Sequence, residues 1–189
     1  MKYLRRLLWF GVNRLVIFSV VIAILIVGFY LAMNTANIYV LLSEGMKLRA
    51  HAILTRESAR DLNNFFIKEF LDADEALSIG LSKDDSPYID YVITDFTYML
   101  SLEWMWSWPW EDEAQAVIVE RVPHIAGSVV TEKKSLVTSG TLSANPPSWR
   151  GGRYNVTLVR INGRWKIAAL EQTQIILEPT PTPSPAPTG

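Results

Sequence analysis

The segment from Leu15 to Met33 has no charged residue over 19 consecutive positions, and this run strongly limits what the chain can be. At about 1.5 Å per residue, a helix of this length spans nearly the whole hydrocarbon layer of a membrane. Trp9 lies before the run and Tyr30 lies close to its end. Such aromatic residues are enriched where a membrane helix leaves the bilayer, so the pattern predicts a transmembrane helix over residues 15–33.

The charges that precede this run predict its orientation. Lys2, Arg5, Arg6 and Arg14 are all basic, and no acidic residue accompanies them. Basic flanks stay on the cytoplasmic side, so we expect residues 1–14 in the cytoplasm and the chain after residue 33 outside the cell membrane. A cleaved signal peptide begins in the same way and stays the alternative, although its apolar run usually has about 7–15 residues.

The composition excludes several classes of function. The formal net charge is −1, and since the N-terminal tail is basic, the part after residue 33 is mildly acidic. A nucleic-acid-binding domain would carry a basic patch, so we expect no nucleic acid partner. The chain has no cysteine and two histidines, His51 and His124. It therefore has no thiolate chemistry and no basis for a specific metal or cofactor site, and both histidines are expected in surface or capping roles.

The expected domain covers residues 34–178, and the sequence of its first part predicts helices. In Ile38 to Leu54 the apolar residues recur at helical spacing, so this stretch can extend the apolar helix. A break at Gly45 is left open. A second helix is expected over Ser58 to Asp72, with an apolar stripe formed by Leu62, Phe65, Phe66 and Phe70. The polar stretch that follows predicts a loop with one helical turn at Asp74 to Ile79.

The second part of this domain predicts strands. From Val92 to Trp108, apolar and aromatic residues occupy even positions and polar residues occupy most odd positions, which is the period of a half-buried strand that should stop or bulge at Pro109. Ala114 to Val122 predicts the next strand, and Ser128 to Leu142 predicts a more exposed one.

The end of the chain carries the clearest short-range signal. Asn162-Gly163 separates two strand-like segments, Arg153 to Ile161 and Arg164 to Gln172, and suits a two-residue turn between antiparallel strands. Residues 179–189 are rich in proline and threonine and predict an extended, disordered tail.

Helices followed by a run of antiparallel strands predict an α+β fold, with the helices packed on one face of a curved sheet. Two helices, a long aromatic strand and a final hairpin with the sequence INGRWKI at Ile161 to Ile167 are similar to the nuclear-transport-factor-2-like, or cystatin-like cone, superfamily over residues 46–174. In that superfamily the cone is an enzyme pocket in some members. In inner-membrane components of secretion and conjugation machines it is an assembly module on a membrane stalk, and the resemblance implies this membrane-anchored, extracytoplasmic type.

The strand carboxylates offer no good general acid or base. Asp95 is the nearest candidate, but its odd position puts it opposite the aromatic face, in solvent. Glu103 and Glu120 are expected in surface ion pairs with Arg121 or Arg160. We therefore expect a non-catalytic interaction or assembly module of the cell envelope, whose partners are the lipid bilayer and either other envelope proteins or a second copy. A cone pocket that binds or acts on a small apolar molecule or lipid is the alternative.

Four residues are candidates for contact with a partner or ligand: Trp108, Trp110, Trp149 and Arg160. Trp104 and Trp106 are expected to fill the space between sheet and helices, because aromatic residues dominate cores. Trp108 and Trp110 flank Pro109 and should lie nearest the rim, where an aromatic surface could meet glycan, peptide or lipid headgroups. Trp149 lies in the loop 145–152. Arg160 shares its face with apolar residues, so it either extends past them into solvent or lines a pocket.

Overall fold

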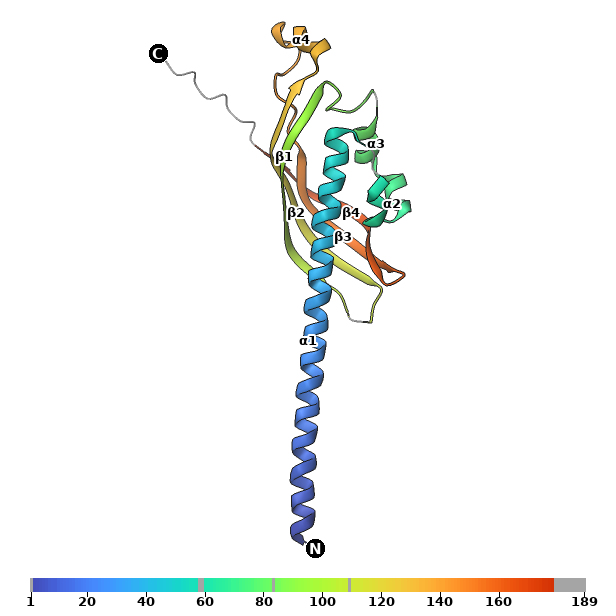
Figure 1. The fold of residues 1–189 in the computed structure, drawn as a ribbon, viewed down its shortest axis with the longest axis vertical. Helices are drawn as coiled ribbons and strands as arrows, with labels where there is room; N and C mark the ends of the chain where they lie inside the picture. The colour runs from blue at the N-terminus through green and yellow to red at the C-terminus, as the bar shows by residue number, and fades with distance from the viewer. Residues whose placement is uncertain (1, 58–59, 83, 109, 179–189) are drawn as a thin grey trace, which may run out of the picture.

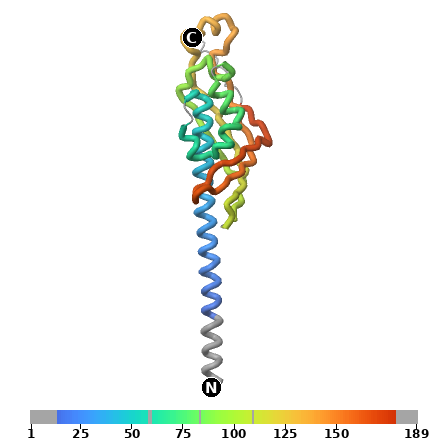
Figure 2. Tube along the Cα trace, turned by 90° about the vertical axis from the view of Figure 1, so that its right-hand side faces the viewer, coloured from blue at the N-terminus to red at the C-terminus, as the bar shows by residue number. Residues whose placement is uncertain are grey.

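The computed structural model describes residues 2–57, 60–82, 84–108 and 110–178, without the side chains of residues 2–13. The fold is α+β, as predicted: a long N-terminal helix, α1 (Lys2–Thr55), precedes short helices and a four-stranded antiparallel sheet. The sheet curves around the C-terminal part of α1, whose N-terminal part extends beyond the domain (Figures 1 and 2). The side chain of Trp9, Pro109 and the tail 179–189 lie outside the described residues.

Helix α1 has two parts that differ in burial. Its side chains from Arg14 to Met33 are all exposed, and this part is long and apolar enough to cross a membrane, a property that signal sequences share. Asn34 is the first buried side chain among the described residues of α1. From there one row of apolar side chains, spaced about one turn apart, is buried along the helix: Ile38, Leu42, Met46, Ala50 and Leu54. The predicted helix over Ile38 to Leu54 is thus confirmed as part of α1.

Gly45 does not break α1, because the helix packs closely there. A Cβ atom at Gly45 would lie 2.9 Å from Cβ of Phe65. The absence of a side chain therefore lets the segment after α1 approach the helix.

The sheet is a meander in the order β1 (Tyr91–Trp106), β2 (Glu113–Val129), β3 (Arg150–Ile161) and β4 (Arg164–Leu177). Its inner face packs on α1 through small and branched residues, among them Ala116, Ile118, Val156, Leu158 and Ile167. At the β3–β4 turn, φ is 52° at Asn162 and 78° at Gly163. Positive values at both turn residues confirm the predicted hairpin.

The inward alternation of β1 changes at Glu103. Phe96, Tyr98, Leu100 and Leu102 are partly buried against the core, as the even positions predict. Between Leu102 and Trp104, β1 then has one residue more than β2, a bulge that moves each following side chain to the other face. Trp104 and Trp106 consequently point outward and are about half exposed. The prediction that they fill the core is wrong.

Two of the expected elements are replaced. The helix predicted over Ser58 to Asp72 is divided into a 3-10 turn, η1 (Arg60–Asn64), and α2 (Lys68–Ala73). The division occurs because Ile67 N–H donates to the carbonyl of Ile167, and Ile167 N–H donates to the carbonyl of Phe65. These bonds attach the segment to β4 instead of continuing a helix. The predicted turn after it is confirmed as α3 (Glu75–Leu81).

The strand predicted over Ser128 to Leu142 is wrong beyond its first residues. Strand β2 ends at Val129, and η2 (Thr131–Lys133) and α4 (Lys134–Thr138) follow. Gly140 has a φ of 75°, and Thr141 and Leu142 donate back to the carbonyl of Leu136, which closes this short helix.

Candidate functional site

A cavity of about 720 Å³ lies between the helices and the inner face of the sheet. We call it the α3 cavity, because α3 forms one of its walls. Its apolar lining comes from Ile53 on α1, Phe70 on α2, Ile79 on α3 and Leu170 on β4. Its polar lining includes Arg49, Tyr88, Trp149, Tyr154 and Gln172. A mostly preformed space with apolar walls and a few polar groups is typical of small-molecule sites.

A buried ion pair forms one wall of the α3 cavity. Arg49 of α1 donates to both oxygens of Asp74, from Nε at 2.6 Å and from Nη2 at 2.8 Å. Asp74 also accepts a hydrogen bond from the backbone N–H of Leu77 and so caps the start of α3. Both charged side chains are less than 10% exposed. The pair therefore fixes α3 against α1 and holds this side of the cavity in place.

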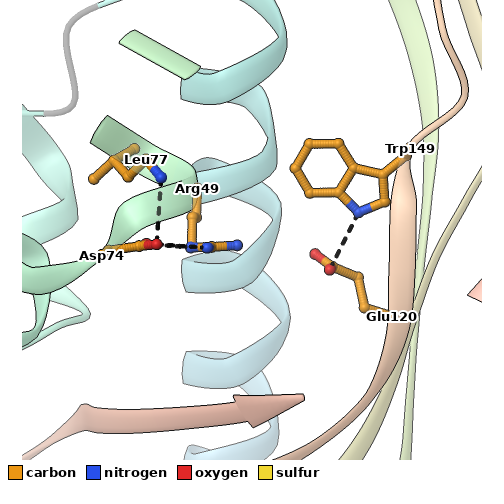
Figure 3. A network of polar contacts seen from close by, with 5 residues as sticks. All are labelled: Arg49, Asp74, Leu77, Glu120 and Trp149. Atoms are coloured by element: carbon orange, nitrogen blue, oxygen red, sulfur yellow. Dashed lines mark hydrogen bonds and ion pairs between the residues drawn. The ribbon is translucent and has the colours of Figure 1, made fainter. Parts of the chain in front are cut away.

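A second buried carboxylate, Glu120 of β2, lies behind the cavity lining. Its Oε2 accepts a hydrogen bond of 3.2 Å from the indole Nε1 of Trp149. Figure 3 shows Arg49 extending from α1 between Asp74 and the Glu120–Trp149 pair. Glu120 is 0% exposed. Burial raises the pKa of Glu120, and the positive charge of Arg49 opposes that shift.

Two tyrosines, Tyr98 and Tyr154, lie beside the carboxylate of Glu120, and Tyr154 also lines the α3 cavity. Burial raises the pKa of Tyr98 and Tyr154, and the charge of Glu120 raises both further. The hydroxyl of Tyr154 accepts a hydrogen bond of 3.1 Å from Gln172 at the cavity lining. The hydroxyls of Tyr98 and Tyr154 lie close enough to Glu120 to favour its charged form, so they partly oppose the effect of burial on its pKa.

Glu120 corrects the sequence-based prediction most clearly. It was expected in a surface ion pair with Arg121 or Arg160, but it faces inward with Ile118 and Val122. Arg121, on the opposite face of β2, instead binds both carboxylate oxygens of Glu178. That guanidinium lowers the pKa of the Glu178 carboxyl.

The four predicted contact residues fall into two groups. Trp149 is buried at the α3 cavity, so it contributes to an internal site instead of an exposed loop. Trp108 and Trp110 are exposed beyond the end of β1, as expected for the rim. Arg160 is partly buried on β3, with its guanidinium carbon 4.4 Å from the ring centre of Trp165 and Nη1 3.9 Å from Asp112. It packs on an aromatic ring at the edge of the apolar face and does not line the α3 cavity.

The other polar residues of the prediction lie outside the cavity. Asp95 is exposed, in agreement with its odd position in β1. Glu103 pairs with Arg153 at 2.8 Å, a surface pair as expected but with a different partner. His124 is exposed, and His51 lies in the last turns of α1 beside Phe96, with 6.0 Å between their ring centres. Within the described part of the chain, no cluster of three metal-binding side chains is present.

Comparison of the chain with protein-family models, with curated proteins and with solved structures finds no match to any of them. Membership of the cystatin-like cone superfamily therefore stays a prediction, based on the order of elements and on the INGRWKI hairpin.

Proposed function

We propose that this chain is a single-pass membrane protein whose α+β domain lies outside the cytoplasm and binds a small, largely apolar ligand in the α3 cavity. Anchoring is supported by the exposed apolar surface of residues 15–33 and by the basic residues that precede it. With this orientation, the cytoplasmic part is the short N-terminal tail, and the domain of residues 34–178 is held close to the outer surface of the membrane.

The α3 cavity is the observation that carries the binding role. Four apolar side chains from three helices and β4 offer surface to the body of a ligand, and Tyr154 and Gln172 offer hydrogen bonds at one side. The fixed Arg49–Asp74 pair keeps the walls apart without help from a ligand. Pre-organised walls lower the cost of binding, because little side-chain ordering is left to occur.

We propose binding without chemical conversion. A general acid or base must reach the reacting atom, directly or through one water molecule. Glu120 lies behind Trp149 and Tyr154, and Arg49 is engaged by both oxygens of Asp74. Both groups therefore position the lining of the cavity. Assembly with other envelope proteins or with a second copy, expected from the sequence, stays a prediction.

Photo-crosslinking with a diazirine derivative of lauric acid tests this proposal. The full-length protein in nanodiscs should be labelled on peptides of the α3 cavity, in addition to residues 15–33, which meet any membrane-dissolved probe. Ala76→Trp fills part of the cavity and should strongly reduce labelling at the cavity peptides. Ser78→Trp adds the same side chain at an exposed position of α3 that does not line the cavity, and should leave labelling unchanged. Labelling confined to residues 15–33 in every variant would contradict the binding role.

A further inference from the structure

Exposed tryptophans gather at the tip of the β1–β2 hairpin. The exposed fractions are 50% for Trp104, 52% for Trp106, 40% for Trp108 and 73% for Trp110. The rings of Trp106 and Trp108 meet edge to face at 5.2 Å, and those of Trp108 and Trp110 stack at 5.1 Å. We call these four side chains the tryptophan tip. Soluble surfaces rarely leave so much contiguous aromatic area in water, so the tryptophan tip indicates a contact surface.

Hydrogen bonds fix the tryptophan tip beside the end of the apolar part of α1. Asn34 follows Met33 directly, and its Nδ2 donates to Ser107 Oγ at 2.8 Å. Its Oδ1 accepts from Trp165 Nε1 on β4 at 2.7 Å. These buried bonds join the helix to both hairpins at the point where the apolar segment ends. The end of β1, where the chain enters the β1–β2 connection, is therefore held at the height of residue 34.

The tryptophan tip extends from there toward the N-terminal part of α1. Figure 1 shows the β1–β2 connection at the end of the domain nearest that part of the helix, and Figure 2 shows the same from the side. Trp110 is three residues beyond Ser107, a distance of at most about 11 Å along the chain. Tyr30 precedes Asn34 by one helical turn, or about 6 Å. The exposed indoles thus lie close to the height at which the apolar helix would leave the hydrocarbon layer.

We infer that the tryptophan tip inserts into the headgroup layer of the membrane that α1 crosses, as a second attachment of the domain. This inference rests on the proposed anchoring. An indole combines a large apolar ring with one N–H donor, which suits the boundary between hydrocarbon and water. The bilayer is the occupant that the geometry favours, because the apolar surface of α1 and the tryptophan tip adjoin each other. A continuous helix holds them at fixed relative heights.

The charges beside the tryptophan tip select the headgroups that it meets. Trp104 and Trp106 line a groove of about 650 Å³ with Glu111, Asp112 and Glu113, all three of which are exposed. Arg160 lies 3.9 Å from Asp112 and offsets part of this negative charge. Aromatic rings beside carboxylates attract ammonium groups and repel headgroups of net negative charge. The surface therefore fits zwitterionic lipids whose headgroup carries an ammonium ion, such as phosphatidylcholine.

Quenching of tryptophan emission measures this contact. The full-length protein is placed in phosphatidylcholine nanodiscs, with and without lipids brominated near the headgroup end of their acyl chains. Subtracting the emission of Trp108→Phe or Trp110→Phe from that of the unsubstituted protein isolates each indole. The difference signals should lose most of their intensity when the brominated lipid is present. Ile175→Trp is the matched control: it adds an indole at an exposed position of β4, toward the far end of the sheet, which should not be quenched.

The possible outcomes separate this inference from the proposed anchoring. Protein that does not elute with lipid would contradict the anchoring, and the inference with it. Protein that does elute with lipid, but whose Trp108 and Trp110 signals are as unaffected as the control, would overturn the inference alone. Crosslinking between two copies through the tryptophan tip in nanodiscs would also overturn it, since the occupant would then be a second copy. Adding phosphatidylglycerol to the discs should reduce the quenching, and equal or stronger quenching would contradict the selection of headgroups.

Discussion

Glu120 lies on the inner face of the sheet, and its protonation state affects the stability of the fold. Its carboxylate is fully buried, accepts a hydrogen bond from Trp149, and lies beside the hydroxyls of Tyr98 and Tyr154. An ionised carboxylate in this position loses its hydration and recovers only part of that free energy from the charge of Arg49 and from the neighbouring indole and hydroxyl groups. Glu120 therefore costs stability when it is charged and costs much less when it is protonated.

This difference predicts a pH dependence for Glu120→Gln. The pKa of Glu120 is raised in the folded state, so its protonated form stabilises the fold below the unfolded value of about 4.5, and this stability is lost as the pH rises through the folded pKa. Glutamine keeps the shape and the acceptor for Trp149 but cannot ionise. Chemical denaturation at several pH values should show equal unfolding free energies near pH 4. The substituted protein should then become progressively the more stable as the pH rises.

Two controls accompany the pH experiment. Glu120→Ala removes the acceptor and leaves the indole N–H of Trp149 unpaired, so it should destabilise the fold by about 1–3 kcal/mol. Asp95→Asn removes one exposed carboxylate from the same sheet and controls for the change in net charge. A constant difference between Glu120→Gln and the unsubstituted protein over the whole pH interval would show that Glu120 does not titrate inside the fold.

The Arg49–Asp74 pair gives a second prediction at the scale of residues. Arg49→Met leaves Asp74 buried without its counter-charge, which should cost about 3–5 kcal/mol of unfolding free energy. Asp74→Asn alone leaves Arg49 unpaired and should cost a similar amount. The double substitution removes both charges and should be less destabilising than the sum of the two, as measured by a double-mutant cycle. Additive effects would show that the two side chains do not interact in solution.

At the scale of elements, the sequence patterns were informative where backbone pairing was regular. The alternation in Ala114 to Val122 carries the correct signal even for Glu120, which shares its parity with Ala116 and Ile118. Its acidic side chain led to the wrong surface assignment. The charge that opposes the pKa shift of Glu120 belongs to Arg49, which is 71 positions away and lies on a helix. No local pattern could bring those two residues together.

Pairing irregularities account for most of the remaining errors. One extra residue at Glu103 reverses the exposure of Trp104 and Trp106, and a bulge of this kind depends on the register with β2, which the sequence of β1 does not contain. The helix predicted across Phe66 is broken for a similar reason, since that segment pairs with Ile167, about 100 positions later. Tertiary contacts outweigh local periodicity at both places.

The bulge also changes the expected result of truncation. Because Trp104 is half exposed on the outer face, Trp104→Ala should cost no more than about 1 kcal/mol, as surface substitutions usually do. Trp165 is the matched control: it is buried and donates to Asn34, and Trp165→Ala should cost about 3–5 kcal/mol. Thermal or chemical unfolding of the full-length protein in detergent measures both values. A larger loss for Trp104→Ala than for Trp165→Ala would contradict the register of β1 against β2.

The β3–β4 turn provides the prediction for backbone conformation. Gly163 has a φ of 78° and open space around its Cα, so a side chain there meets strain and no steric contact. Gly163→Val should lower the unfolding free energy by about 1 kcal/mol or more, because branched residues disfavour this region. Gly163→Asn keeps a residue that tolerates positive φ and should cost clearly less. Equal stability of both variants in thermal unfolding would contradict the turn geometry.

At the scale of the whole molecule, α1 belongs to both the apolar segment and the folded domain. No described residue interrupts the helix between Arg14 and Thr55, and burial begins one residue after the apolar run ends. Asn34 contacts β1 through Ser107 and β4 through Trp165. The orientation of the domain is therefore coupled directly to that of the apolar segment, because the described part of α1 runs through both without a break.

The buried contacts of Asn34 support the proposed anchor over a cleaved signal peptide. The best small-residue site for a signal peptidase lies at residues 34–36, inside α1. Cleavage there would remove Asn34, and Trp165 and Ser107 would lose their buried partner. We therefore expect the membrane-extracted protein to keep residues 1–33, as measured by intact mass.

The orientation is tested with a reporter enzyme that is active only outside the cytoplasm. The reporter should be active when it is fused after Gly189 and inactive when it is fused before Lys2. Replacing Arg5, Arg6 and Arg14 by glutamine should weaken the proposed orientation, since basic flanks favour the cytoplasmic side. A soluble product that begins near residue 37 would contradict the anchor.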